Sequence, residues 1–116
     1  MAQQVIDFIL PAKLSTNNIY AGTHWSVRKK HKDLFLWGFI EVASKIKPVD
    51  KCNLEFEFQF RSKPLDCDNC SYMVKLLIDC LRHYGKIKDD TLDYVESIKI
   101  TSKKSNKNNV LIKISE

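Results

Sequence analysis

The sequence predicts an α+β fold, a single domain over residues 1–116 in which a mixed β-sheet packs against two helices. Its length of 116 residues allows one hydrophobic core and is too short for two. Four short segments are apolar or alternate between apolar and polar residues, as strands do, and two longer segments have helical spacing. The order along the chain is β-α-β-α-β-β, without repeats or low-complexity segments.

The first half of the chain contains a strand, a polar loop and a long helix. The segment VIDFIL (5–10) predicts a strand, and STNNIYAG (15–22) is rich in turn residues. From about residue 26 to 46 apolar residues recur at helical spacing. The stripe consists of Phe35, Leu36, Phe39, Ile40, Val42, Ala43 and Ile46. Leu34 and Trp37 widen it beyond what one sheet face should bury, which predicts burial against a partner subunit.

The second half contains a strand, a helix and two further strands. NLEFEFQFR (53–61) alternates strictly between apolar and polar residues and is the clearest strand. A helix is predicted from about residue 69 to 84, with Gly85 as its stop signal. YVESIKIT (94–101) and NVLIKIS (109–115) alternate as well, and the polar loop between them predicts a hairpin.

The charge of the chain is unevenly distributed. The net charge is +5, but residues 66–96 hold seven acids and four bases, so this window carries −3 and the rest carries +8. A basic body suits a polyanion such as nucleic acid. An acidic window would repel phosphate unless a divalent metal ion bridges the two. The acids are Asp66, Asp68, Asp79, Asp89, Asp90, Asp93 and Glu96.

The sequence predicts a cytoplasmic protein with reduced cysteines. No apolar run approaches the ~18–20 residues that span a bilayer, and MAQQVIDFILPAK lacks the pattern of a secretion signal. Cys52 and Cys80 are isolated, whereas Cys67 and Cys70 form a C-x2-C pair. A zinc module at this pair is an alternative interpretation, although structural zinc usually needs a second pair of Cys or His.

Two carboxylates precede the second predicted helix. Hydrolysis of a phosphodiester next to a repelling anion is aided by divalent metals, and Mg²⁺ prefers carboxylate oxygens. Asp66 and Asp68 supply two such ligands, and the positive end of the helix favours the ionised form of Asp68. The alternative is structural: Asp68 as a helix N-cap, Asp66 as a turn residue, and Asp89 and Asp90 as ordinary loop acids.

Lys75 lies two helical turns after Asp68, on the same face of the predicted helix. Its side chain is long enough to reach a phosphate at the helix start. An i,i+4 ion pair with Asp79 is the competing interpretation.

Several motifs together resemble the RusA family of Holliday junction resolvases, small endodeoxyribonucleases common in phages and prophages. They are DCDN (66–69), Lys75, IDCL (78–81), GKIKDD (85–90) and Val95, with LPAKLSTNNIY (10–20) similar to the opening strand and Asn-rich loop of the family. The resemblance covers nearly the whole chain, and the predicted element order agrees with it. Between Asn69 and Lys75 there are three more residues than in the shortest form of the motif, which shifts Lys75 by about 4–5 Å along the helix.

The resemblance implies a homodimeric, Mg²⁺-dependent enzyme, with Mn²⁺ as the alternative cofactor, that acts in DNA recombination and repair. Such an enzyme resolves four-way junctions by paired symmetric incisions, through in-line attack of water that leaves a 5′-phosphate. The metal-binding and catalytic aspartates of the family match Asp66, Asp68 and Asp90, and its active-site lysine matches Lys75. Asp89 is a weaker candidate. A non-catalytic protein that binds branched DNA is the alternative.

Basic residues in two places are predicted to contact DNA. RKKHK (28–32) places cations at the start of a helix, where they oppose the helix dipole, and this favours phosphate contact over a solvated face. The corresponding residues are Arg28, Lys29, Lys30 and Lys32, with Lys103 and Lys104 in the second place. Tyr20, His24 and Trp25 carry rings that can stack on exposed bases, although core packing is expected for Trp25.

Overall fold

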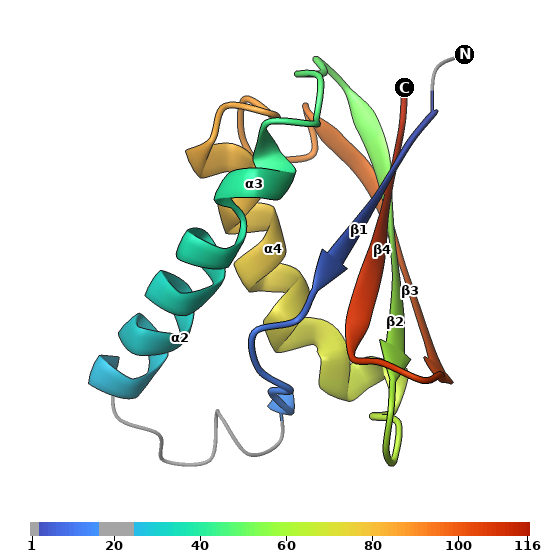
Figure 1. Cartoon of the computed structure of the whole chain (residues 1–116). Coiled ribbons are helices and arrows are strands. Elements are labelled where there is room, and N and C mark those ends of the chain that lie inside the picture. Colours follow the sequence, from blue (N-terminus) through green and yellow to red (C-terminus); the bar gives the residue numbers. More distant parts are fainter. Residues whose placement is uncertain (1–2, 17–24) are drawn as a thin grey trace.

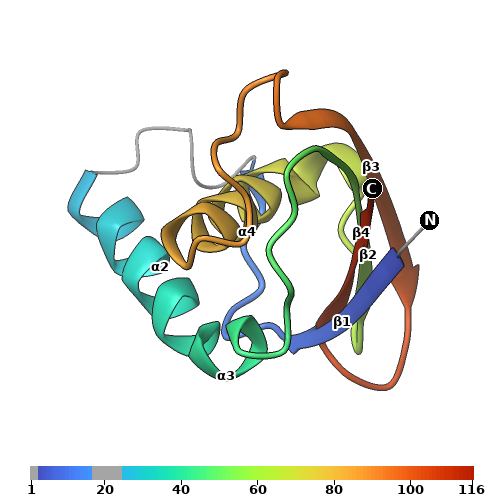
Figure 2. The same ribbon diagram turned by 90° about the horizontal axis from the view of Figure 1, so that it is seen from above.

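A four-stranded sheet and a layer of helices form the described part of the molecule, and the described helices cover one face of the sheet (Figures 1 and 2). The computed structural model describes residues 3–16 and 25–116. The strands are β1 (Gln3–Ile9), β2 (Cys52–Phe60), β3 (Val95–Lys104) and β4 (Asn109–Ser115). Their order across the sheet is β1-β4-β2-β3. β2 is parallel to β3, and β4 is antiparallel to both β1 and β2, so the predicted α+β fold with a mixed sheet is confirmed.

The predicted hairpin between the last two strands is wrong. β3 and β4 are consecutive in the chain, but β2 lies between them in the sheet. Alternation of apolar and polar residues determines which side chains face the core, but it does not determine which strands are neighbours in the sheet. Because every second side chain of β2 is fully buried, this strand takes a central position and pairs on both sides.

The first predicted helix is divided in two. α2 (Trp25–Gly38) is followed by the short α3 (Ile40–Ala43), so the expectation of one helix from residue 26 to 46 is wrong beyond Gly38. The amide of Phe39 is shared between the carbonyl oxygens of Phe35 at 3.0 Å and Leu36 at 3.3 Å, which tightens the backbone at the break. Gly38, a poor helix former, lies directly before it.

The second predicted helix is close to its expected position. α4 (Ser71–His83) is preceded by a 3-10 turn, η1 (Cys67–Cys70). Gly85 ends the helical region with a φ of 73°, a conformation that glycine adopts without strain. α4 lies side by side with α2, and its buried residues face the core of the sheet (Figure 1). None of the described helices is long and apolar enough to cross a lipid bilayer.

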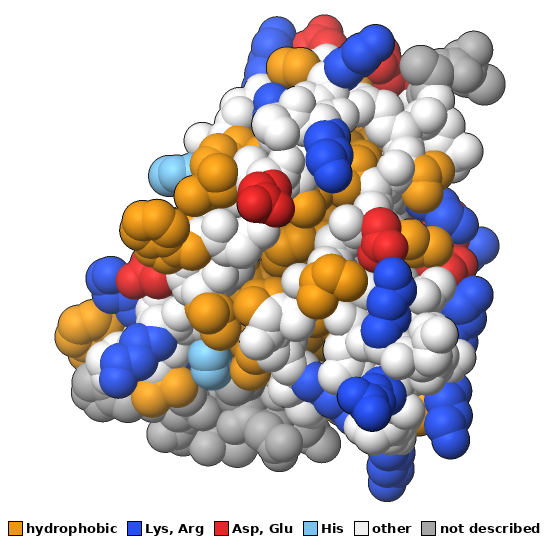
Figure 3. Space-filling model, in the orientation of Figure 1, with side chains coloured by type: hydrophobic (Ala, Val, Ile, Leu, Met, Phe, Trp, Pro, Cys, Tyr) orange, Lys and Arg blue, Asp and Glu red, His pale blue; other side chains and the backbone are white. Residues whose placement is uncertain are grey.

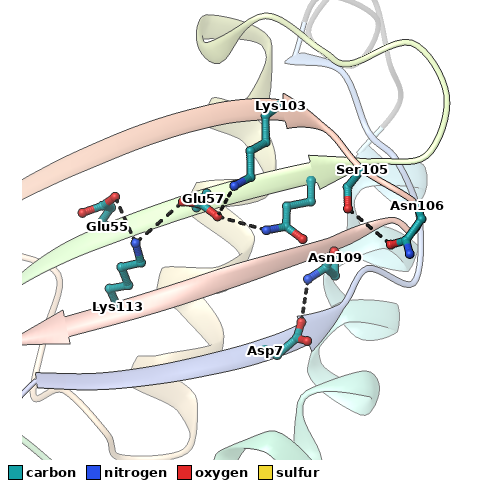
Figure 4. A network of polar contacts seen from close by, with 9 residues as sticks. Asp7, Glu55, Glu57, Lys103, Ser105, Asn106, Asn109 and Lys113 are labelled. Carbon is teal, nitrogen blue, oxygen red and sulfur yellow. Dashed lines mark hydrogen bonds and ion pairs between the residues drawn. The ribbon is translucent and has the colours of Figure 1, made fainter.

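The two faces of the sheet differ in character. The face toward the helices carries the side chains of Phe56, Phe58 and Phe60, all with no exposed surface. The other face, which we call the open face, carries paired charges (Figure 4). There Glu57 lies 3.2 Å from Lys103 and 3.7 Å from Lys113.

Candidate functional site

Two grooves flank α4 and contain half of the predicted site residues. The first, which we call the carboxylate groove, lies between α4, β3 and the loop before β3, and has a volume of about 310 Å³. Its polar lining consists of Ser71, Lys75, Asp79 and Asp90. The second, which we call the basic groove, lies between α2 and α4 and has a volume of about 330 Å³. Lys75 and Asp79 line both grooves, because they project from the ridge of α4 between them.

Asp66 and Asp68 lie before α4 and are exposed. Neither acts as a side-chain cap: Asp66 is the N-cap residue of η1 and Cys70 that of α4, and neither N-cap makes a side-chain hydrogen bond. The structural role as a helix cap that the sequence allowed for Asp68 is therefore absent. Within residues 3–16 and 25–116, both carboxylates are also without an ion-pair partner. Both side chains are thus open to a ligand.

Asp90 lies in the loop between α4 and β3 and contacts the helix through Arg82. The Arg82 guanidinium is 3.8 Å from Asp90 and 3.4 Å from Asp89. Asp89 also accepts a hydrogen bond of 2.8 Å from the amide of Asp90. This bond, aided by Arg82, lowers the pKa of Asp89 and keeps it ionised. Asp89 is thus the better-anchored member of the pair.

The three predicted metal ligands lie at different points along α4. Asp66 lines a shallow hollow with Lys13 and Lys63, whereas Asp90 lines the carboxylate groove. That groove extends along α4 to Ser71, whose hydroxyl donates to the carbonyl oxygen of Asp68 at 2.9 Å.

Arg82 contacts Asp90. At ~1.5 Å per residue, Arg82 lies about 16 Å beyond Ser71 along the axis of α4. Mg²⁺ prefers carboxylate oxygens, so the side chains of Asp66, Asp68 and Asp90 fit this ion in their chemistry. Their placement does not: among the residues that the structure describes, no three His, Cys, Asp or Glu side chains are gathered to hold a metal.

Lys75 is exposed and does not form the ion pair that the sequence allowed. Asp79 pairs with Arg82 at 3.6 Å, and in the described part of the chain Lys75 makes no ion pair. The alternative of a Lys75–Asp79 pair is therefore wrong. Lys75 instead shares the carboxylate groove with Asp90.

The basic groove brings three of the four predicted helix cations together with Lys75. Arg28, Lys29 and Lys32 line it, whereas Lys30 does not. Lys29 is paired with Asp33 at 2.9 Å. The floor is apolar, since Tyr72 and Leu76 are 4% and 5% exposed. A groove with a cationic rim and an apolar floor suits a nucleic-acid strand, because phosphates and sugar or base surfaces meet both.

The second predicted DNA-binding pair is divided between the two faces of the sheet. Lys103 pairs with Glu57 on the open face, whereas Lys104 is the next residue of the strand and points to the helix side. There Ser102 donates to the carbonyl oxygen of Leu65, beside Asp66. Figure 3 shows Lys and Arg side chains gathered at this lower end of the sheet. Lys104 is thus on the side of the predicted ligands, and Lys103 is not.

The predicted stacking residues fall mostly outside the described part. Tyr20 and His24 lie outside the described residues. Trp25 is 64% exposed, so the expectation of core packing for this residue is wrong. It is the first residue of α2, whose buried residue, Phe35, lies ten positions further along.

Sequence reasoning missed four residues that the structure places beside the predicted site residues: Lys13, Lys63, Tyr72 and Arg82. Lys13 and Lys63 flank Asp66, and they are brought there by a hydrogen bond from the Lys13 ammonium to the carbonyl oxygen of Lys63. No local pattern points to them, since their proximity depends on the tertiary fold. For Arg82 a signal exists, because it lies at i+3 from Asp79 on one helix face.

The C-x2-C pair forms the two ends of η1, with Asp68 between the two cysteines. Cys67 is exposed, whereas Cys70 is buried, and burial followed by the charge of Cys67 raises the pKa of Cys70 to about 12. Cys52 and Cys80 are both buried at other points of the core. The described residues thus contain no second Cys or His pair beside Cys67 and Cys70.

Comparison with known proteins adds no relative. A search of protein-family models finds no match to this chain, and a search of curated proteins finds no significant match.

Proposed function

We propose that this protein is a divalent-metal-dependent DNA endonuclease of the RusA type, which resolves four-way junctions in recombination and repair. One observation carries the proposal: Lys75 lines both the basic groove and the groove that contains Asp90. A phosphate held in the basic groove is therefore next to a surface of exposed carboxylates. The resemblance of the sequence motifs to those of the RusA family supports the same function.

The proposed roles follow from position. Asp66 and Asp68 would hold Mg²⁺, or Mn²⁺ in its place, and Asp90 is the third proposed ligand, which lines a different hollow from Asp66. When bound, the metal ion would lower the pKa of a water molecule coordinated to it and would neutralise negative charge at the phosphate. Lys75 binds the scissile phosphate. Arg28 and Lys32 hold one arm of the junction by its backbone, with Lys104 at the end of β3 as a further contact.

The proposed assembly is a homodimer, because two symmetric cuts require two sites related by a two-fold axis. The exposed apolar side chains of α2 and of the start of α3 are the proposed contact. Leu34, Trp37 and Ile40 are 44%, 75% and 47% exposed, and Trp37 and Ile40 line a hollow with Tyr84. These side chains remain uncovered in the single chain, as the sequence predicted for Leu34 and Trp37.

A cleavage assay with two variants tests the activity. A synthetic four-way junction and a linear duplex of the same sequence are incubated with and without Mg²⁺. We expect symmetric nicks in the junction only, with Mg²⁺ only. Asp68→Asn should lower the rate by about 10³-fold, equivalent to ~4 kcal/mol, with junction affinity within about threefold of the wild type. Asp93→Asn, which removes an exposed acid from the loop before β3, is the matched control and should leave cleavage unchanged.

A second candidate is a branched-DNA-binding protein without catalysis. The observation that favours it is the separation of the predicted ligands along α4 among the described residues. Tight junction binding without Mg²⁺-dependent nicks, in the wild type and both variants, would establish this function in place of the first.

A further inference from the structure

Three lysines from separate segments of the chain lie where β2 and β3 end, and we call them the end patch. Lys13 lies in the segment after β1, Lys63 in the loop after β2, and Lys104 is the last residue of β3. Lys13 and Lys63 line a hollow of about 260 Å³ together with Asp66. The patch thus carries three positive charges against one carboxylate, a net charge of +2.

Lys104 belongs to the end patch through the register of the sheet. It is the register partner of Phe60, and the Lys13 ammonium lies 5.4 Å from the centroid of the Phe60 ring. Ser102, two residues earlier and on the same side of the sheet, donates to the carbonyl oxygen of Leu65, which also lines the hollow. The side chain of Lys104 therefore extends from the side of the sheet on which the hollow lies.

The cations of the end patch lack an anionic partner, and one of them is held in place. The Lys13 ammonium donates to the carbonyl oxygen of Lys63 and lies over the ring of Phe60, which has no exposed surface. A cation held in this way loses little conformational freedom when an anion binds to it. Within residues 3–16 and 25–116, none of the three lysines forms an ion pair.

Two lysines near the opposite end of β2 provide a contrast. Lys51 directly precedes β2 and pairs with Glu96 at 3.0 Å. Lys88 pairs with Asp50 at 2.9 Å. These two cations have the same charge as those of the end patch, but their partners are already present in the chain. Only the end patch therefore offers its positive charges to a ligand.

The end patch and the basic groove lie on different sides of α4. Figure 1 shows α4 between α2, whose cations line the basic groove, and the sheet, whose lower end carries the end patch. Asp66 lies in the hollow of the end patch, and Asp68 lies in η1, the turn that connects this region to α4. Cations that can contact phosphate are thus available on both sides of the start of α4.

We infer that the end patch is a second phosphate-binding surface, which contacts the backbone of the DNA molecule that the basic groove also holds. This inference rests on the proposed function, because it takes the ligand to be DNA. A cation that contacts a DNA phosphate releases a counterion from the DNA, so each such contact increases both the affinity and its dependence on salt. Unpaired cations supply these contacts without first breaking an ion pair within the protein.

Fluorescence anisotropy of a synthetic four-way junction, in EDTA and at several salt concentrations, tests the end patch without reference to cleavage. Lys63→Gln with Lys104→Gln should weaken binding by about tenfold and lower the slope of log affinity against log salt by about two. Lys51→Gln with Lys88→Gln is the matched control, because it removes the same charge from paired positions, and it should stay within about twofold. Lys13 is retained because its contacts support the fold.

Combination with the basic groove tests whether both surfaces contact one DNA molecule. If they do, Lys63→Gln and Lys104→Gln added to Arg28→Gln and Lys32→Gln should weaken binding by about 100-fold, because losses at separate sites of one complex add in free energy. If each surface bound DNA alone, either pair of substitutions would leave the other surface intact and cost only about twofold. Losses that small in both pairs would overturn the inference.

The outcomes separate the end patch from the nuclease. An unchanged affinity in Lys63→Gln with Lys104→Gln, or an equal loss in the control, would overturn the end patch even if the wild type cuts junctions. A loss confined to the end-patch variant, in a protein that does not cut junctions, would support the patch and refute the nuclease. Absence of junction binding by the wild type would refute both. Urea unfolding should give the same midpoint for both variants, because all four lysines are exposed.

Discussion

The open face of the sheet and the surroundings of α4 both carry acids and bases but arrange them differently. On the open face the acids have partners: Asp7 pairs with Lys107, Glu55 with Lys113, and Glu57 with two lysines. Figure 4 shows the pairs of Glu55 and Glu57 across the strands, together with the hydrogen bond that Asn109 donates to Asp7. Beside α4, by contrast, Asp66 and Asp68 have no cationic partner in the described chain.

The same contrast holds for the cations. Arg28, Lys32 and Lys75 line the grooves beside α4 without an ion pair among the described residues. Charges that neutralise one another on a sheet surface have their partners already and offer little to a ligand. Unpaired acids and unpaired bases that both lie near α4 favour a ligand that brings charges of both signs. A phosphate backbone with a divalent cation is such a ligand.

The largest expected difference between the two sides of the molecule concerns self-association through their exposed apolar side chains. Trp37 is 75% exposed on α2, and Ile9 is 59% exposed on the open face. Trp37→Lys should weaken self-association at least ~30-fold, because a buried Trp contributes ≥2 kcal/mol to many interfaces. Ile9→Lys should leave it unchanged. Sedimentation equilibrium of the three proteins measures both effects, and equal weakening by both variants would place the contact elsewhere than on α2.

The second largest expected difference between the two sides concerns their affinity for DNA. Arg28→Gln with Lys32→Gln should weaken junction binding by about tenfold and reduce its salt dependence, because two phosphate contacts are lost. The matched control removes two cations from the open face, Lys103→Gln with Lys113→Gln, and keeps the same net charge. Fluorescence anisotropy at several salt concentrations compares them. Equal losses in both double variants would show that only net charge matters, and the basic groove would lose its role.

Much of the fold could be predicted from the sequence, because local patterns determine it. β4 was predicted at its exact bounds, and β2 within one residue, since strict alternation marks the buried face of a strand. The order of strands could not be predicted in the same way: the polar loop before Asn109 is compatible with a hairpin or a longer crossing. The end of α2 at Gly38 also depends on packing, since Phe35 and Phe39 both bury their rings against Phe8.

The candidate site was predictable in its residue types and only partly in its geometry. Asp66, Asp68 and Asp90 could be selected because acids concentrate in one window and match a motif. The separation of these acids in space could not be predicted, because the position of a loop acid depends on tertiary partners such as Arg82. Sequence patterns identify which side chains a helix or strand presents, whereas distances between loops depend on the assembled fold.

The smallest expected effect is a pH-dependent loss of stability on the open face. A hydrogen bond from Gln59 at 3.0 Å, and then the ammonium of Lys103, lower the pKa of Glu57. A lowered pKa in the folded state means that ionised Glu57 stabilises the fold above its unfolded pKa of about 4.3, and that this contribution disappears as the pH falls through the folded value. Glu57→Gln should therefore lower the free energy of unfolding by less than ~1 kcal/mol at pH 7, and by progressively less below pH ~4. Urea unfolding at both pH values measures the difference, and junction binding should stay unchanged. A loss of DNA affinity in Glu57→Gln would contradict the purely structural role assigned to the open face.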